Sequence, residues 1–281
     1  MRRFLSIMAA GARKFAPLKE GSAKNTHLPR LKGIVFDVDG TLCQPQNYMF
    51  GEMRNALSIT KEIDILDHIY SLPTPEDREK AMESIRDIER TAMSKQQAQP
   101  GLVELMTYID SKNLPKGICT RNFDMPVDHL LTKFLSAIKP FHPIITREFR
   151  PPKPDPAGIL HIARSWGFTR PDGPSGGERG ELKKVFMGNG AEVKSEVVGA
   201  GDGTSELDVG GKGEEADASG LIMVGDSIDD MTAGRRAGAA TVLLVNPANE
   251  HLAKHEHTDL VIGRLDELIG HLEDGFTGRE M

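Results

Sequence analysis

The chain has 281 residues, with 35 Lys and Arg against 41 Asp and Glu, and carries a formal net charge of −6. This mild acidic excess argues against a nucleic-acid partner, and no apolar run is long enough for a transmembrane helix, so no membrane partner is expected. Two cysteines cannot form a disulfide scaffold, which favours an intracellular protein. The chain is only 38% hydrophobic and contains 29 glycines, so part of it is expected not to pack.

The first segment, residues 1–30, is basic and contains a single acid, Glu20. We predict a basic flexible leader here. Its Arg-rich, amphipathic character is also typical of a mitochondrial transit peptide, so the expected location is cytoplasmic, or mitochondrial if the segment is a targeting signal.

A short apolar run at 33–37 ends in an acid and predicts a buried strand of a parallel sheet. Two helices are predicted next, over 53–72 and 76–95, separated by Pro73 and Pro75. This αα-hairpin interrupts the chain directly after the first strand. It is therefore expected over the carboxyl edge of the sheet, where open α/β sheets bind ligands.

The remaining pattern alternates strand and helix, which predicts an α/β fold with a Rossmann-like parallel sheet. The core is assigned to 31–43, 100–168 and 221–275, and the helical unit inserted after the first strand to 44–99. Strands are expected at 116–120, 143–146, 221–225 and 240–245, and helices at 126–138, 156–167 and 229–237.

Residues 169–220 differ in composition from the rest of the chain. They hold 13 of the 29 glycines and many acids. Such a segment buries too little apolar surface to offset the entropy of ordering it, so we predict a disordered Gly- and acid-rich insertion.

Four short polar patches follow or close the predicted strands. Because the carboxyl ends of parallel strands meet at one edge, these patches are expected to converge there. They contain Asp37-Val-Asp39-Gly-Thr-Leu, Thr120-Arg121, Lys153-Pro-Asp-Pro and Gly-Asp226-Ser-Ile-Asp-Asp230.

Carboxylates this close repel one another unless a cation lies between them, and oxygen ligands without Cys or His favour Mg²⁺. Mg²⁺ with a lysine and a hydroxyl group suits the charged oxygens of a phosphoryl group. Asp37, at the end of its strand, is the candidate nucleophile that would form an aspartyl-phosphate. Asp39 is placed to protonate the leaving oxygen and then to deprotonate water.

The same patches, in this order, resemble the four motifs of the haloacid dehalogenase (HAD) superfamily of hydrolases. The resemblance covers about 33–265, and the blocks at 41–50 and 118–122 look like an uncharacterised fungal branch of it. It implies a HAD core carrying a small mobile helical cap that closes the site and selects the substrate.

The resemblance also implies roles for individual residues. Asp37 would accept the phosphoryl group, and Asp39 would act as general acid and base. Thr120, the backbone N–H of Arg121, and Lys153 would bind the phosphate. The metal ligands would be Asp37, Asp39 through its carbonyl, Asp226 and Asp230.

An acid at position 39 favours phosphoryl transfer over carbon–halogen cleavage, because the dehalogenase members lack it. The expected function is a Mg²⁺-dependent phosphatase acting on a small phosphorylated metabolite. A phosphomutase of the same superfamily and a catalytically silent binding protein remain alternatives, and the sequence leaves the oligomeric state open. One further hypothesis is that oxidation of Cys43 blocks the site.

Overall fold

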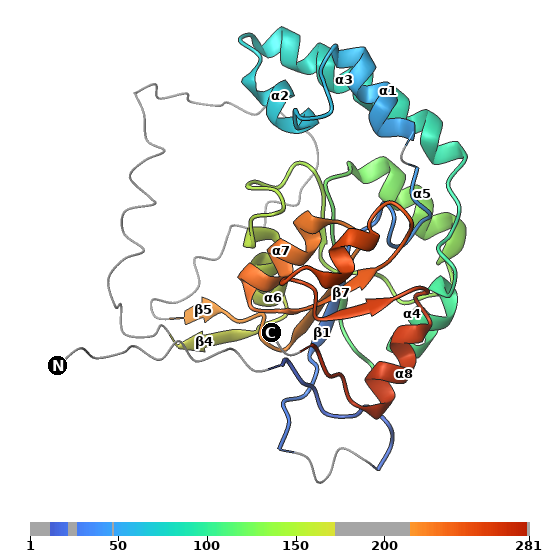
Figure 1. Cartoon of the computed structure of the whole chain (residues 1–281), viewed down its shortest axis with the longest axis vertical. Coiled ribbons are helices and arrows are strands. Elements are labelled where there is room, and N and C mark those ends of the chain that lie inside the picture. The colour runs from blue at the N-terminus through green and yellow to red at the C-terminus, as the bar shows by residue number, and fades with distance from the viewer. Residues whose placement is uncertain (1–11, 22–26, 47, 172–213, 280–281) are drawn as a thin grey trace, which may run out of the picture.

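A six-stranded, entirely parallel sheet forms the centre of the computed structural model, which describes residues 12–21, 27–46, 48–171 and 214–279 (Figure 1). The strand order is β3-β2-β1-β6-β7-β8. The strands are β1 (Gly33–Phe36), β2 (Lys116–Cys119), β3 (Ile144–Ile145), β6 (Leu221–Gly225), β7 (Ala240–Leu244) and β8 (Leu260–Ile262). The predicted Rossmann-like α/β fold is confirmed.

Helices cover both faces of this sheet. Alternate residues of β1 therefore enter two different cores: Ile34 and Phe36 join one apolar cluster, and Val35 joins the other. The first cluster is closed by α4 (Leu102–Ser111), α5 (Asp124–Phe134) and α8 (Glu267–Asp274), and the second by α6 (Ala157–Ser165) and α7 (Ile228–Ala237). A short 3₁₀ helix, η2 (Glu250–Lys254), follows β7. None of the helices in the described ranges combines the length and the apolar character needed to cross a membrane.

The helical cap between β1 and α4 contains three helices, α1 (Tyr48–Leu57), α2 (Ile65–Ser71) and α3 (Pro75–Ser94), which stand apart from the sheet at the top of Figure 1. They share an apolar cluster of their own, which includes Met53, Ile69 and Ile85. The cap can therefore hold together as a separate packing unit.

The single helix predicted over 53–72 is wrong. The chain leaves the helical path at Ser58, which has a φ of 54°. It re-enters at Asp64, whose carboxylate accepts hydrogen bonds from the backbone N–H groups of Leu66 and Asp67. An N-cap aspartate of this kind begins a new helix rather than continuing an old one.

The predicted disordered insertion at 169–220 needs a correction at both ends. Thr169–Pro171 (β4) and Glu214–Ala216 (β5) pair as an antiparallel two-stranded sheet. Asp217 extends the pairing by donating its backbone N–H to the carbonyl of Phe168. The prediction for residues 172–213 lies outside the described residues.

The predicted flexible leader at 1–30 is also wrong for part of its length. Phe15 is buried against Phe276, with ring centroids 5.7 Å apart, and its backbone N–H donates to the Phe276 carbonyl. Lys14 forms a β-bridge with Thr277, and the guanidinium of Arg13 donates to the carbonyl of Gly238. Sequence periodicity missed this packing because the partners lie at the other end of the chain. The parts of the leader at 1–11 and 22–26 lie outside the described residues.

We predict that Phe15→Ala lowers the free energy of unfolding by about 3 kcal/mol, because it removes a buried aromatic ring and leaves a cavity beside Phe276. Urea denaturation followed by circular dichroism measures the change. Leu28→Ala, at a side chain that is 39% exposed, is the matched control and should change the value by less than about 1 kcal/mol. Equal effects of the two substitutions would contradict packing of this segment.

Candidate active site

The four polar patches meet at the carboxyl edge of the sheet, beneath the cap. Asp37 follows β1, Thr120 follows β2, and Asp226 follows β6, while Lys153 lies in the loop between β3 and α6. The strands are in register across this edge: Phe36 pairs with Ile118 on one side and with Val224 on the other. The parallel sheet is therefore what brings these distant segments together.

Three carboxylates form a tight group, since Asp37, Asp226 and Asp230 each place an oxygen within 4.8 Å of the others. Asp230 is fully buried in the first turn of α7, where Ser227 donates its backbone N–H and its hydroxyl to the carboxylate. Burial and the neighbouring acids raise the pKa of Asp226 to about 8. Burial is also the main reason that the pKa of Asp37 is raised, to about 7.

Lys153 holds two of these carboxylates together. Its buried ammonium donates to Asp37 Oδ1 at 2.7 Å and to Asp230 Oδ1 at 2.5 Å. Burial alone would lower the pKa of Lys153, but the carboxylates of Asp230 and Asp37 raise it above its ordinary value. Lys153 is therefore a permanent positive charge at the centre of the site.

One lysine does not balance three carboxylates, so the group has the composition of a cation site. All three are hard oxygen donors, the ligand type that Mg²⁺ prefers. Burial is the main cause of the raised pKa of Asp226, and the negative charges of Asp230 and Asp37 add to it. The residues present therefore fit a divalent cation held by Asp37, Asp226 and Asp230.

Asp39 lies next to this group, and residues of the core domain contact its carboxylate. Its Oδ2 accepts a hydrogen bond of 2.8 Å from Asn122 Nδ2, and Cys43 Sγ lies 3.7 Å from its Oδ1. Burial raises the pKa of Asp39, although the Asn122 hydrogen bond opposes the shift. Gly40 then turns the chain with a φ of 82°, and any Cβ there would collide with the carboxylate of Asp226.

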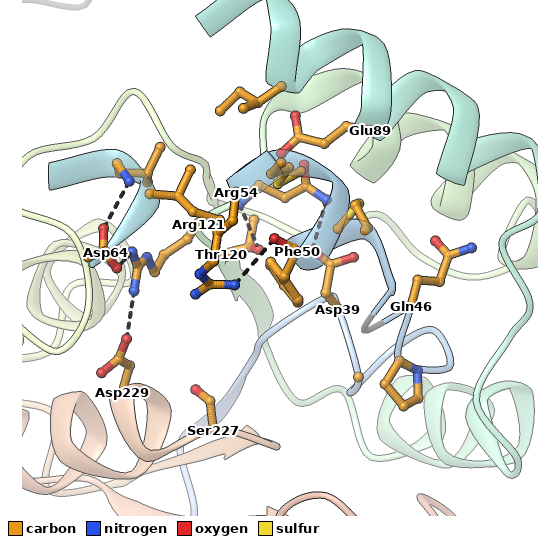
Figure 2. A pocket seen from close by; sticks show the side chains of 18 of the residues that line it. Asp39, Gln46, Phe50, Arg54, Asp64, Glu89, Thr120, Arg121, Ser227 and Asp229 are labelled. Atoms are coloured by element: carbon orange, nitrogen blue, oxygen red, sulfur yellow. Dashed lines mark hydrogen bonds and ion pairs between the residues drawn. The ribbon is translucent and has the colours of Figure 1, made fainter. Parts of the chain in front are cut away.

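Thr120 and Arg121 lie on the loop after β2. Thr120 is buried, and its Oγ1 accepts the backbone N–H of Asn122 at 3.2 Å. The expectation for Arg121 concerned only its backbone N–H. In the structure its side chain also joins core to cap, because the guanidinium contacts Asp64 in the cap at 2.5 Å and Asp229 at the start of α7 at 2.7 Å (Figure 2).

A second arginine joins core to cap. Arg147, after β3, is buried and forms an ion pair with Glu89 of α3. Its Nε also donates to the carbonyl of Arg121 at 3.2 Å. Sequence analysis did not single out Arg147 or Glu89, and it gave no role to Asn122, which belongs to the block at 118–122. Only Asn122 had a local signal, its position two residues after Thr120.

Cap and core enclose a pocket of about 870 Å³. Asp37, Asp39, Thr120, Lys153 and Asp226 lie on its core side, and α1, α2 and α3 supply the cap side. Figure 2 shows Asp39 and Thr120 among the lining residues of the core, with Phe50, Arg54 and Glu89 among those of the cap. The pocket is large enough for a small metabolite.

Cys43 is fully buried beside Asp39, and its backbone forms bridges with Asp39 and Ala98. Burial, with the negative charge of Asp39 as a second cause, raises the pKa of its thiol well above the ordinary value. Because the thiolate is the form that oxidants attack, this environment argues against the oxidation hypothesis.

Comparisons with known proteins agree with this architecture. A family model described as HAD-hydrolase-like matches residues 179–268. An uncharacterized hydrolase of Saccharomyces cerevisiae is 38% identical over 243 residues, which is 86% of this chain and 89% of the relative. A haloacid dehalogenase-like hydrolase domain-containing protein of Arabidopsis thaliana is 32% identical over 226 residues, covering 76% of this chain and 71% of the relative.

Solved structures share the fold. A HAD hydrolase of family IA, variant 3, from Entamoeba histolytica superposes with a TM-score of 0.59 at 16% identity, covering 86% of this chain and 98% of that one. The two curated relatives indicate one family, and the sheet order and the cap inserted after β1 are consistent with it. This chain belongs to the HAD-like hydrolases.

Proposed function

We propose that this protein is a Mg²⁺-dependent phosphatase that hydrolyses a small phosphomonoester through an aspartyl-phosphate on Asp37. The observation that carries the proposal is the placement of Asp37 at the centre of the edge. It contacts Lys153 at 2.7 Å, lies within 4.8 Å of Asp226 and Asp230, and has Asp39 two residues away on the same loop.

Asp37 has one oxygen bonded to Lys153. The second carboxylate oxygen is then the nucleophile. Lys153 lowers the repulsion between this carboxylate and an anionic phosphoryl group, and the Thr120 hydroxyl and the backbone N–H of Arg121 supply donors from the neighbouring loop. Mg²⁺, held by the three carboxylates and the Asp39 carbonyl, would neutralise the phosphoryl oxygens and keep Asp37 ionised.

Asp39 has the properties of a general acid and base. Burial favours its protonated form, and Asn122 fixes the direction of its carboxyl group. In the first step Asp37 forms a bond to phosphorus, the bond to the ester oxygen breaks, and Asp39 gives its proton to that oxygen. In the second step Asp39 takes a proton from water, the oxygen of that water bonds to phosphorus, and Asp37 is released with inorganic phosphate.

The phosphomutase alternative uses the same first step. It differs in the acceptor, which is a hydroxyl of the substrate rather than water, so the product separates the two: inorganic phosphate for a phosphatase and an isomer for a mutase. A silent binding protein needs none of this chemistry. The retention of Asp37, Asp39 and Lys153 supports catalysis over that alternative.

We predict that Mg²⁺ stabilises the wild-type protein. At ten times its dissociation constant, Mg²⁺ should add about 1.4 kcal/mol, or a few degrees in Tm, measured by differential scanning calorimetry. In Asp226→Asn this response should disappear, while the Tm without metal stays level or rises because one repelling charge is lost. The control, Asp128→Asn at an exposed position on α5, should respond like the wild type. An undiminished response in Asp226→Asn would contradict the proposed ligand set.

We predict that Asp37→Asn lowers kcat for p-nitrophenyl phosphate by about a thousandfold or more, since the amide cannot accept the phosphoryl group. The assay measures p-nitrophenolate release with Mg²⁺ present. Full activity in this variant would exclude the covalent mechanism.

We predict a different outcome for Asp39→Asn. p-Nitrophenolate is a good leaving group that needs little protonation, but attack by water on the aspartyl-phosphate still requires a base. This variant should therefore release one equivalent of p-nitrophenolate in a burst and retain a phosphoryl group on Asp37. Mass spectrometry of the acid-quenched protein measures that group. Steady turnover without any trapped phosphoryl group would remove Asp39 from the second step.

A further inference from the structure

The pocket extends well beyond the phosphate site, and its charged side chains can be sorted by their partners. Five basic residues line it: Arg54, Lys61, Arg121, Arg147 and Lys153. The last three are occupied by carboxylates. Arg121 contacts Asp64 and Asp229, Arg147 contacts Glu89, and Lys153 contacts Asp37 and Asp230.

Arg54 and Lys61 differ from the other three basic residues. Neither Arg54 nor Lys61 forms an ion pair with any carboxylate in the described part of the chain. Both belong to the cap, with Arg54 on α1 and Lys61 in the loop that leads to α2. The cap side of the pocket therefore carries two cations that form no ion pair among the described residues.

Arg54 is only partly exposed, and most of its hydrogen-bonding capacity is unused. Its Nη1 donates to the carbonyl of Phe50 at 3.3 Å, one turn earlier in α1 (Figure 2). Its Nε is buried and has no acceptor among the described residues. A guanidinium has five N–H donors arranged as a planar fork that matches a carboxylate or a phosphate. An anionic group in the pocket would accept charge-assisted hydrogen bonds from the Nη hydrogens that Phe50 does not engage.

The side chains around Arg54 indicate the other chemical features that a ligand would need. Apolar side chains of the cap, among them Met49, Met53 and Ile65, line the same pocket. The two acids that line the cap side of the pocket, Asp64 and Glu89, are each paired with an arginine from the core, so they do not compete for Arg54. Glu62 does not line the pocket and forms no ion pair with Arg54 among the described residues; its pKa is lowered mainly by a hydrogen bond from Thr60 and further by the charges of Lys61 and Arg54. An anion entering here meets an uncommitted cation next to an apolar wall.

We propose that Arg54 is a specificity-determining residue that binds a second anionic group of the substrate, at the end opposite to the phosphoryl group that reacts. The substrate class is then a phosphomonoester that also carries a carboxylate or a second phosphate. Lys61, which is more exposed, adds a second positive charge on the same side. This inference rests on the proposed function, because it assumes that the reacting phosphoryl group lies at Asp37.

The test compares matched substrates in the full-length protein with Mg²⁺. The uncharged reference is the methyl ester of 4-carboxyphenyl phosphate, the carboxylate probe is 4-carboxyphenyl phosphate, and the bisphosphate probe is benzene-1,4-diyl bisphosphate. Release of inorganic phosphate gives kcat/KM for each. The quantity compared is the ratio of the charged probe to the ester, so differences in leaving-group reactivity cancel between protein variants.

We expect this ratio to fall by about tenfold or more in Arg54→Leu, because charge-assisted hydrogen bonds to the second anion are lost. The loss should be mainly in KM, since the contact is equally present before and during the reaction. Arg54→Lys should recover part of the ratio by restoring the charge without the fork. Arg78→Leu, on an exposed face of α3 outside the pocket, is the matched control and should keep the wild-type ratio. Whichever probe loses more in Arg54→Leu identifies the anion, carboxylate or phosphate.

The outcomes separate this inference from the proposed function. If wild-type protein hydrolyses p-nitrophenyl phosphate but the ratio is the same in Arg54→Leu as in wild type, the role of Arg54 is wrong and the phosphatase proposal stands. If no phosphate is released from any of these substrates with Mg²⁺ present, both fail. Circular dichroism melting of each variant shows whether the cap is intact, and Arg54→Gln, which keeps an amide donor of similar length, replaces the leucine variant if that one melts early.

Discussion

The repulsion among carboxylates at one edge of the sheet is the constraint on which the rest of the site depends. Parallel strands bring Asp37, Asp226 and Asp230 within 4.8 Å of one another. Two like charges at 4 Å repel by about 4 kcal/mol at an effective dielectric constant of 20, so the arrangement needs positive charge to persist. Lys153 supplies one positive charge against these three carboxylates. Burial, together with the charges of Asp230 and Asp37, also raises the pKa of Asp226.

The backbone packs closely against these carboxylates. A Cβ at Gly40 would run into the Asp226 carboxylate, and one at Gly225 would run into the side chain of Asp230. Gly40 lets the turn after β1 approach the loop after β6, and Gly225 leaves room for Asp230 beside the end of β6. The acids of the site and the two glycines beside them therefore form one packed unit. A side chain at either glycine would displace an acid of the site.

The cap is tied to this unit through the loops that follow β2 and β3. Arg121 and Arg147 leave the core side and contact Asp64 and Glu89 in the cap. The Arg121 pair is partly exposed and contributes little net stability, whereas breaking the buried Arg147–Glu89 pair from one side would leave an uncompensated charge. Because Arg147 also donates to the Arg121 carbonyl, the position of the cap and the shape of the loop after β2 are coupled. Arg54 forms no ion pair in this network.

The sequence by itself determined the parallel sheet, the inserted cap and the set of residues at the carboxyl edge, because buried strands, strand–helix alternation and short motifs are all local patterns. It could not determine contacts between distant segments. Phe15 packs on Phe276, β4 pairs with β5 across the insertion, and Arg147 reaches Glu89, and in each case the partners are separated by tens to hundreds of residues. Local pattern also misjudged the cap, where Asp64 begins a new helix inside a stretch of helical periodicity. The set of residues at the edge thus follows from local patterns, whereas which charged side chains of the pocket remain without an ion pair depends on the contacts that form in three dimensions.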